Sequence, residues 1–289
     1  MTAAVRPRRS VLYMPGSNAR ALEKARGLSA DGLILDLEDA VAPDAKALAR
    51  TQVCDAVKAR GFGRREVVIR INALSTAWGE DDLKAAIDAR PDAILVPKVS
   101  SPKDLAEVEA RLGDAAVALW AMIETPRAIL DVGDIAGAGG RLAGFVMGTN
   151  DLIKEFRGVH TPDRLNLAAS LGLAVAAARA YGLAILDGVY NDISDTDGFY
   201  NACQQGRAFG FDGKTLIHPS QLAPCNEVFA PSFDEVEAAR MIIAAFDKPE
   251  NRGKGAIAID GRMVERLHAE IARYTVALAE AITALEHHP

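Results

Sequence analysis

Two acidic residues each follow an apolar run in the middle of the chain. Glu124 ends AVALWAMIE, and Asp151 comes directly after FVMGTN. Both runs are too apolar for an exposed edge, which predicts buried parallel strands. A carboxylate at the end of a buried strand costs free energy unless a positive group compensates it. Two such carboxylates, one strand–helix unit apart, predict a shared hard cation, Mg²⁺ first and Mn²⁺ as the alternative.

Other polar residues also stand at the ends of apolar runs. They are Asp36, Glu38, Asp39, Arg70, Asn72, Lys98, Asn150, Asp187 and His218. In a barrel of parallel strands the active site lies at the C-terminal ends of the strands. Polar side chains gain nothing from the core there. We therefore interpret the set as a ring around a catalytic site, with a barrel that only binds a ligand as the alternative.

Three members of this ring have competing interpretations. Arg70, within VVIRIN, has a guanidinium suited to bidentate capture of a substrate carboxylate. An internal salt bridge to Asp36 or Glu38 is the alternative, and the two roles can coexist. Lys98 pairs with a carboxylate of the ring, either as part of the site or only for structure. His218, before a proline, is expected to be a hydrogen-bonded barrel residue rather than a metal ligand.

The first loop, PGSNARALEKA, is a candidate for binding phosphate groups. The helix after it offers free N–H groups at its start, and Arg20 and Lys24 lie one turn apart on one helix face. Together with Arg9 they could hold the phosphates of a nucleotide-like ligand. A glycine-containing turn before a helix is also common without a ligand, and the basic start MTAAVRPRRS has a frayed tail as its other interpretation.

Short apolar runs alternate with helical patterns from near residue 10 to near residue 230. The runs are SVLYMP, GLILDLED, EVVIRIN, AILVPKV, AVALWAMIE, LAGFVMG, AILDGVY and GKTLIHP. Eight βα units in about 220 residues predict a (β/α)₈ TIM barrel of the α/β class. A doubly wound open sheet is the alternative. It is disfavoured because no GxGxxG fingerprint follows the first strand.

The pattern changes after residue 230, so we expect a catalytic barrel over residues 1–230 and a C-terminal helical extension over residues 231–289. In the extension, AIAIDGRMV is typical of a hairpin. The final helix is expected to carry an apolar stripe of Val264, Leu267, Ile271, Tyr274, Leu278 and Ile282. The stripe packs either on its own barrel or on a neighbouring copy. We expect a homo-oligomer in either case, a trimer or a hexamer.

Composition argues against several classes of function. The 289 residues are 49% hydrophobic and 25% charged, as in ordinary globular proteins. A net charge of -6 argues against nucleic acid as a partner. No apolar run reaches the roughly 18 residues that cross a bilayer, and the basic start lacks the apolar stretch of a secretory signal. Cys54, Cys203 and Cys225 form no CxxC motif, which favours a reducing cytoplasm and no structural zinc.

Six motifs in order carry a resemblance over nearly the whole chain. They are RSVLYMPGSNARALEKA, DGLILDLEDAV, VVIRIN, ILVPKV, MIETPRAI and GTNDL. Together the motifs closely resemble the citrate lyase β-subunit-like family, within the HpcH/HpaI aldolase superfamily. That family includes malyl-CoA, β-methylmalyl-CoA and citramalyl-CoA lyases. Six motifs in register are far more specific than any one of them alone.

The resemblance implies roles for individual residues. Glu124 and Asp151 correspond to the Mg²⁺ ligands, and Arg70 to the residue that holds the oxo-acid carboxylate and oxygen. Asp36 and Glu38 resemble the acidic pair near the metal waters and the arginine.

For the rest of the site, Arg20 and Lys24 resemble contacts of the coenzyme A phosphates. Met122, Thr125 and Pro126 flank the metal ligand and shape the pocket. IAIDGRMVE resembles a C-terminal lid that covers a neighbour's active site and supplies an acid/base aspartate, which makes Asp260 the candidate.

The resemblance implies a Mg²⁺-dependent carbon–carbon lyase. Such an enzyme splits a 3-hydroxyacyl-CoA, malyl-CoA or citramalyl-CoA, into an acyl-CoA and a 2-oxo acid, or joins them by Claisen condensation. Three alternatives stay open: a citrate lyase β subunit that acts on a carrier-protein thioester, a malyl-CoA thioesterase, and a barrel that binds these ligands without turnover. The oxo acid itself (glyoxylate, pyruvate or oxaloacetate) does not follow from the motifs.

Overall fold

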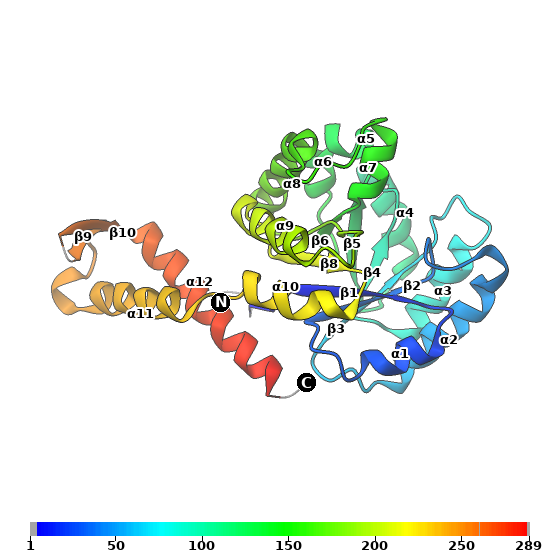
Figure 1. Cartoon of the computed structure of the whole chain (residues 1–289), viewed down its shortest axis with the longest axis horizontal. Helices are drawn as coiled ribbons and strands as arrows, with labels where there is room; N and C mark the ends of the chain where they lie inside the picture. The colour runs from blue at the N-terminus through cyan, green and yellow to red at the C-terminus, as the bar shows by residue number, and fades with distance from the viewer. Residues whose placement is uncertain (1–4, 260, 288–289) are drawn as a thin grey trace. The chain divides into compact units, whose positions relative to one another are not determined.

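The computed structural model describes residues 5–259 and 261–287. Eight parallel strands close into a barrel in chain order, β1 to β8, as Figure 1 shows. They are β1 (Ser10–Pro15), β2 (Gly32–Asp36), β3 (Glu66–Arg70), β4 (Ala93–Val96), β5 (Ala118–Ile123), β6 (Leu142–Met147), β7 (Ala184–Asp187) and β8 (Gly213–Leu216). The predicted (β/α)₈ barrel is thereby confirmed, and the doubly wound alternative is wrong.

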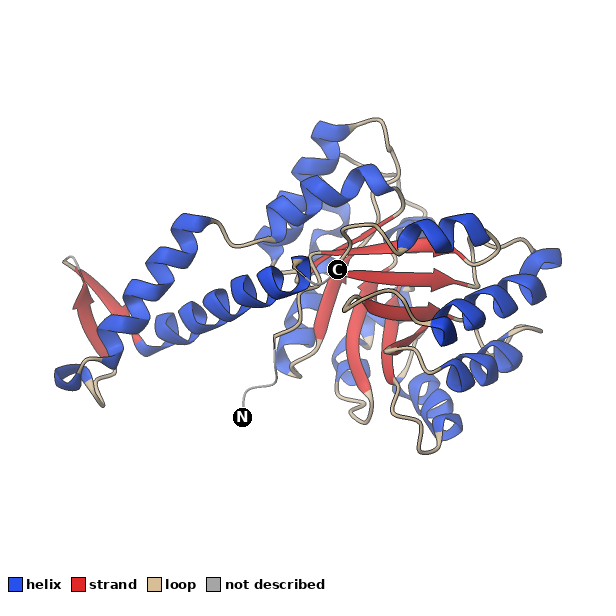
Figure 2. Cartoon of the chain, turned by 90° about the horizontal axis from the view of Figure 1, so that it is seen from below, coloured by secondary structure: helices blue, strands red, loops and turns tan. Residues whose placement is uncertain are grey.

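Helices lie on the outside of the barrel, as Figure 2 shows; α1 to α9 connect successive strands, and α10 follows β8. They are α1 (Ala19–Ala25), α2 (Lys46–Ala59), α3 (Gly79–Ala89), α4 (Pro102–Leu112), α5 (Pro126–Leu130), α6 (Val132–Ala136), α7 (Thr149–Glu155), α8 (Ala168–Ala180), α9 (Thr196–Phe209) and α10 (Leu222–Phe229). Helix starts follow ordinary capping chemistry. The Asn18 side chain accepts from Ala21 N before α1, and the Thr125 side chain accepts from Ala128 N before α5.

Alternating side chains fill two separate cores. One set points into the barrel and includes Val11, Ile34, Val68, Trp120 and Leu186. The residues between them point outward and pack under the helices in a larger cluster. Because the side-chain period of a strand is two, the phase of each strand decides whether its last residue faces into the barrel or away from it. That phase controls which polar residues can meet in one site.

Residues 8–229 form one compact unit, and residues 230–287 with residues 5–7 form a second. The second unit contains α11 (Phe233–Asp247), the antiparallel pair β9 (Ala256–Ile259) and β10 (Arg262–Glu265), and α12 (Arg266–Glu286). The strand pair agrees with the expected hairpin. Val264, however, lies in β10 and not on the final helix, because α12 begins only at Arg266. The described residues contain no helix with the length and apolar character that crossing a membrane requires.

Candidate active site

Arg70 is the last residue of β3 and points into the barrel mouth. It shares its strand face with Val68, which lies in the barrel interior. Its Nε and Nη2 donate to Asp36 Oδ1 and Oδ2 at 2.6 and 2.7 Å, a bidentate pair. The Tyr13 ring lies 4.8 Å from the Arg70 guanidinium carbon. The internal salt bridge considered for Arg70 is therefore present, and Nη1 remains directed away from Asp36.

Asp36 acts as a positioning residue. Besides Arg70, its Oδ1 accepts from Glu38 N at 2.9 Å and its Oδ2 from Ala40 N at 3.0 Å. Each carboxylate oxygen therefore has two donors, and the side chain is fully buried. A carboxylate held in this way fixes both the arginine and the loop after β2. The sequence-based prediction that Asp36 is catalytic stays a prediction, and the contacts seen here are to Arg70 and to backbone N–H groups.

Glu38 is the carboxyl group in the mouth that has no aligned hydrogen bond. Arg70 Nη1 lies 2.9 Å from its Oε2, but the geometry is not that of a hydrogen bond, and Oε2 is buried without another partner among the described residues. Burial raises the pKa of Glu38 to about 7; Arg70 opposes this rise, and neighbouring carboxylates add to it. A carboxyl that titrates near neutral pH can accept or donate a proton under ordinary conditions.

Glu124 and Asp151 converge on one cation, the ammonium group of Lys98. Glu124 directly follows β5 and is 1% exposed, and Asp151 lies in the first turn of α7. Lys98 Nζ donates to Asp151 Oδ2 and lies 3.5 Å from Glu124 Oε1. The predicted pair therefore does meet, and in this structure a lysine supplies the positive charge between the two carboxylates.

The backbone around this pair is specialised for close approach. Lys98 has a left-handed backbone with φ 55°, an uncommon conformation for a lysine, and its N–H donates to Glu124 Oε1 at 2.7 Å. At Gly148, before α7, a Cβ atom would lie 2.5 Å from Glu124 Oε2. Burial raises the pKa of Glu124, and Lys98 opposes that rise. The site thus holds a buried carboxylate whose charge depends on a nearby cation.

The donor set fits a magnesium ion. Glu124 and Asp151 offer hard carboxylate oxygens on neighbouring βα units, and Lys98 shows that a positive charge is accommodated between them. The described residues contain no group of three histidine, cysteine or acidic side chains that could hold a metal. Mg²⁺ is commonly bound through one or two carboxylates, with water and substrate oxygens completing the octahedron. Zinc, which prefers nitrogen and sulfur ligands, is not favoured.

Arg9 was expected to join Arg20 and Lys24, and this expectation is wrong. Arg20 and Lys24 are exposed on α1, after β1. Arg9 precedes β1, is 4% exposed, and pairs through Nη2 and Nε with Asp31 at 2.8 and 2.9 Å. It therefore clamps the N-terminal ends of β1 and β2, at the opposite end of the barrel.

Asp187 also lies outside the site. Leu186 points into the barrel, so the next residue points outward. There Asp187 accepts from Arg164 at 2.7 and 2.8 Å and from Lys214 at 2.8 Å. Burial alone would raise the pKa of Asp187, but Lys214 and Arg164 outweigh it and hold this pKa below its usual value. Asp187 is thus part of a buried ion-pair network with Arg164 and Lys214.

The remaining predicted residues support the site without forming its centre. His218 Nδ1 lies 2.8 Å from Ser220 Oγ and caps the following turn, as expected of a hydrogen-bonded residue. Met122 points into the barrel, where its sulfur lies 3.5 Å from the Tyr13 hydroxyl. Thr125 and Pro126 form the start of α5. Asp260 lies outside the described residues.

Sequence reasoning missed two residues of the site, Tyr13 and Lys46. Tyr13 shares a strand face with the inward Val11, so strand alternation could have found it. Lys46 Nζ donates to the carbonyls of Leu37 and Glu38 at 2.8 and 2.7 Å and to Asn72 Oδ1 at 2.8 Å. Lys46 is the first residue of α2, where a positive charge interacts unfavourably with the helix dipole. This unfavourable placement is the feature of the sequence that could have identified Lys46.

Known proteins resemble this chain over almost its full length. A curated relative from Cereibacter sphaeroides (strain KD131 / KCTC 12085), named (3S)-malyl-CoA thioesterase, is 52% identical and is matched over 98% of this chain and 99% of its own. The citrate lyase subunit beta of Leuconostoc mesenteroides subsp. cremoris is 33% identical, over 96% and 94%.

A solved structure also matches: the protein CitE from Mycobacterium tuberculosis in complex with magnesium, acetoacetate and coenzyme A. It is 29% identical, with a TM-score of 0.78, over 97% of this chain and 100% of that one. The sequence profile of the HpcH/HpaI aldolase/citrate lyase family matches residues 9–219, which span the barrel from the start of β1 to the turn after β8. This chain belongs to the HpcH/HpaI aldolase/citrate lyase family.

Proposed function

We propose that this protein is a Mg²⁺-dependent enzyme that hydrolyses a malyl-CoA-type thioester to the free 2-hydroxy acid and coenzyme A. The observation that carries the proposal is the convergence of Glu124 and Asp151 on one positive charge beside Arg70. The 52% identical relative named (3S)-malyl-CoA thioesterase supports hydrolysis as the outcome. We therefore prefer the thioesterase, one of the alternatives, to the lyase that the motifs led us to expect.

Glu124 and Asp151 are the residues that would hold Mg²⁺. When bound, the ion would supply a Lewis acid for the oxygens of the hydroxy-carboxylate end of the substrate. Magnesium in the related CitE structure supports this assignment. Lys98, which pairs with both carboxylates, would then be released to contact the substrate.

Arg70 would bind the carboxylate of the substrate. Its Nε and Nη2 are committed to Asp36, which fixes the plane of the guanidinium. Nη1, which lies 2.9 Å from Glu38 Oε2, is the guanidinium nitrogen that Asp36 leaves for the substrate. An arginine whose rotamer is fixed before the ligand arrives loses less side-chain entropy on binding.

Glu38 is the proposed general base for hydrolysis. With a pKa of about 7 it is partly ionised at neutral pH, and its Oε2 has no aligned donor to hold it in the resting state. It would accept a proton from the water that attacks the thioester carbonyl, and the thiolate of coenzyme A would leave. Arg20 and Lys24 on α1 would bind the coenzyme A phosphates.

Carbon–carbon cleavage is the second candidate, favoured by the family and by the 33% identical citrate lyase subunit beta. In that reaction malyl-CoA gives acetyl-CoA and glyoxylate, and a group must protonate the methylene carbon that becomes the methyl group. We propose Asp260 for that role, on the resemblance of IAIDGRMVE. Asp260→Asn should then abolish glyoxylate release and leave hydrolysis by Glu38 largely intact.

One product analysis separates these outcomes. Purified protein is incubated with (3S)-malyl-CoA and Mg²⁺, and free thiol, malate, acetyl-CoA and glyoxylate are quantified. Thiol and malate in equal amounts, abolished by EDTA, are expected. If acetyl-CoA and glyoxylate are formed instead, the protein catalyses the lyase reaction and not hydrolysis. If folded protein yields neither pair of products from malyl-CoA or citramalyl-CoA, the proposed catalysis is wrong and a ligand-binding barrel remains.

A further inference from the structure

The C-terminal unit contains a pocket of its own. A cavity of about 240 Å³ lies between α11, the loop after it and the first turns of α12. Phe246 and Ala269, at 9% and 1% exposure, provide its apolar base. Three arginines, Arg252, Arg266 and Arg273, line its walls. All of these residues belong to residues 230–287, so the pocket is formed within the second unit.

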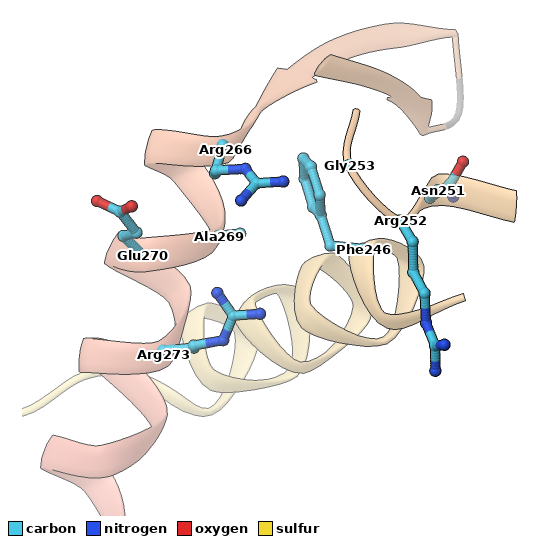
Figure 3. Close-up of a pocket in the computed structure, with 8 residues that line it drawn as sticks. All are labelled: Phe246, Asn251, Arg252, Gly253, Arg266, Ala269, Glu270 and Arg273. Carbon is cyan, nitrogen blue, oxygen red and sulfur yellow. The ribbon is translucent and has the colours of Figure 1, made fainter. Parts of the chain in front are cut away.

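Two of the three arginines, Arg266 and Arg273, point into a common space. Arg266 and Arg273 lie about two turns apart on α12, and so on one face of the helix. Figure 3 shows both guanidinium groups extending from that face toward α11 and Phe246, whereas Glu270 points to the other side of the helix. Arg252, on the loop after α11, also lines the pocket, but Figure 3 shows its side chain pointing away from the other two guanidinium groups. The two guanidinium groups that share this space therefore both come from α12.

Three arginines and one acidic residue, Glu270, line the pocket, so its positive charge exceeds its negative charge. Arg273 Nη2 lies 3.3 Å from Asp247 Oδ1. Arg266 Nη2 reaches only a backbone carbonyl, that of Lys254, at 3.4 Å. Within residues 5–259 and 261–287, no carboxylate lies within ion-pair distance of Arg252 or Arg266.

Exposed arginines elsewhere in the chain occur both with and without a carboxylate partner. Arg111, Arg127, Arg179 and Arg240 each have a carboxylate oxygen within 3.0 Å. Among the described residues, no carboxylate lies within ion-pair distance of Arg20, Arg90 or Arg157. Arg266 and Arg273 differ from these isolated arginines because both extend from one face of α12 into the same cavity. Two like charges placed together repel each other unless an anion compensates them.

The walls of the pocket are held in place before any ligand binds. Asn251 Nδ2 donates to Ala245 O at 2.8 Å, which ties the loop to α11. Lys254 Nζ donates to Asn251 Oδ1 at 3.0 Å, and Arg266 N donates to Gly255 O at 2.9 Å, which ties the loop to α12. Preorganised donors reduce the entropy lost on binding.

We propose that this pocket binds a multiply charged oxyanion of the phosphate type. Guanidinium forks from Arg266 and Arg273 donate to its oxygens, and the apolar base limits competition from water. The anion is either free inorganic phosphate or diphosphate, or the phosphate part of a nucleotide-like molecule. These sources share the chemistry that the pocket recognises.

The test uses the full chain and pyrophosphate as the probe. Arg20→Gln and Lys24→Gln are introduced throughout to remove the candidate phosphate contacts of the barrel, and EDTA is present so that no step depends on a metal. Isothermal titration should show one pyrophosphate site whose affinity falls as NaCl is raised. Arg266→Gln together with Arg273→Gln should weaken binding at least tenfold.

Matched variants make the outcome decisive. Arg240→Gln removes one exposed positive charge from α11, away from the pocket, and should leave the affinity unchanged. Arg266→Lys keeps the charge but loses the fork, and should weaken binding by several fold. Circular dichroism checks that each variant is folded. Equal affinity in the parent and the Arg266→Gln/Arg273→Gln variant, or an equal loss in Arg240→Gln, would overturn the proposal.

A second titration, with ADP, distinguishes the sources. Binding of ADP at least tenfold tighter than pyrophosphate, lost in the same arginine variants, supports a nucleotide-borne ligand. Equal affinities support a free anion. Neither result depends on turnover at the barrel, so the pocket and the proposed enzyme function can fail separately.

Discussion

At the scale of single residues, the site is organised by where positive charge meets buried carboxylates. Arg70 is committed to Asp36 on one edge, and Lys98 bridges Glu124 and Asp151. Glu38 lies beside Arg70 and has a raised pKa. The three features assign substrate binding, metal binding and proton transfer to different side chains.

Lys98 should compete with Mg²⁺ for the same carboxylates. Lys98→Met removes the internal cation and leaves Glu124 buried without compensation, so we expect the metal-free protein to lose about 1–3 kcal/mol of stability. Mg²⁺ should then raise the melting temperature by more in the variant than in the wild type. Lys103→Met, on exposed α4, is the control. Thermal unfolding measures these melting temperatures. An equal Mg²⁺-induced shift in the wild type and in Lys98→Met would contradict the competition between Lys98 and Mg²⁺.

The pKa of Glu38 predicts a pH-dependent effect on stability. Because this pKa is about 7 in the folded chain and 4.5 for a glutamate side chain in water, folding favours the protonated form. The stabilisation is present below pH 4.5 and is lost as the pH rises through about 7. Glu38→Gln should therefore raise the free energy of unfolding by up to about 3 kcal/mol at pH 8 and change it little at pH 4.5.

Urea unfolding in EDTA at the two pH values measures this difference. Asp55→Asn, which changes an exposed carboxylate on α2, is a control that should behave like the wild type at both values. A variant Glu38→Gln that is less stable than the wild type at pH 8 would show that Glu38 is held ionised by Arg70, contrary to the account.

At the scale of elements, strand phase explains both what could be predicted from the sequence and what could not. The eight apolar runs identified the strands, and the ends of β2, β3 and β5 supplied Asp36, Arg70 and Glu124 to the mouth of the barrel. Asp187 was misplaced because β7 is short, and a shift of one residue turns a side chain to the other face.

Two other misplacements have a related cause. Arg9 was misplaced because its partner Asp31 is distant in sequence and has no local signature. Val264 was misplaced because an apolar residue before Arg266 fits the end of a strand and the start of a helix equally well.

The Asp187 network predicts a large effect on stability. Asp187→Asn would leave Lys214, which is fully buried, without its carboxylate, so we expect a loss of about 3–5 kcal/mol in the free energy of unfolding. Asp212→Asn affects a more exposed pair with Arg179 and should cost much less. Chemical denaturation compares the two variants. If Asp187→Asn and Asp212→Asn lose similar free energies of unfolding, burial does not determine how much these ion pairs contribute to stability.

At the scale of the whole molecule, the chain combines a barrel with a second compact unit that carries its own chemistry. Leu267, Ile271 and Tyr274 on α12 are each about half exposed, which leaves an apolar face uncovered. We propose that this face packs on another copy of the chain in a homo-oligomer. Ile271→Asp with Tyr274→Asp should lower the mass measured by light scattering. An unchanged mass would exclude this face from the assembly.

The central claim is that Glu124 and Asp151 hold the metal on which turnover of a malyl-CoA-type thioester depends. Its most direct test is the release of thiol from (3S)-malyl-CoA with Mg²⁺, compared among wild type, Glu124→Gln and Asp151→Asn, with circular dichroism to verify folding. The account predicts Mg²⁺-dependent release by the wild type and a loss of at least about a hundredfold in each variant, or about 3 kcal/mol. Release that persists in folded Glu124→Gln, or that is indifferent to EDTA in the wild type, would contradict it.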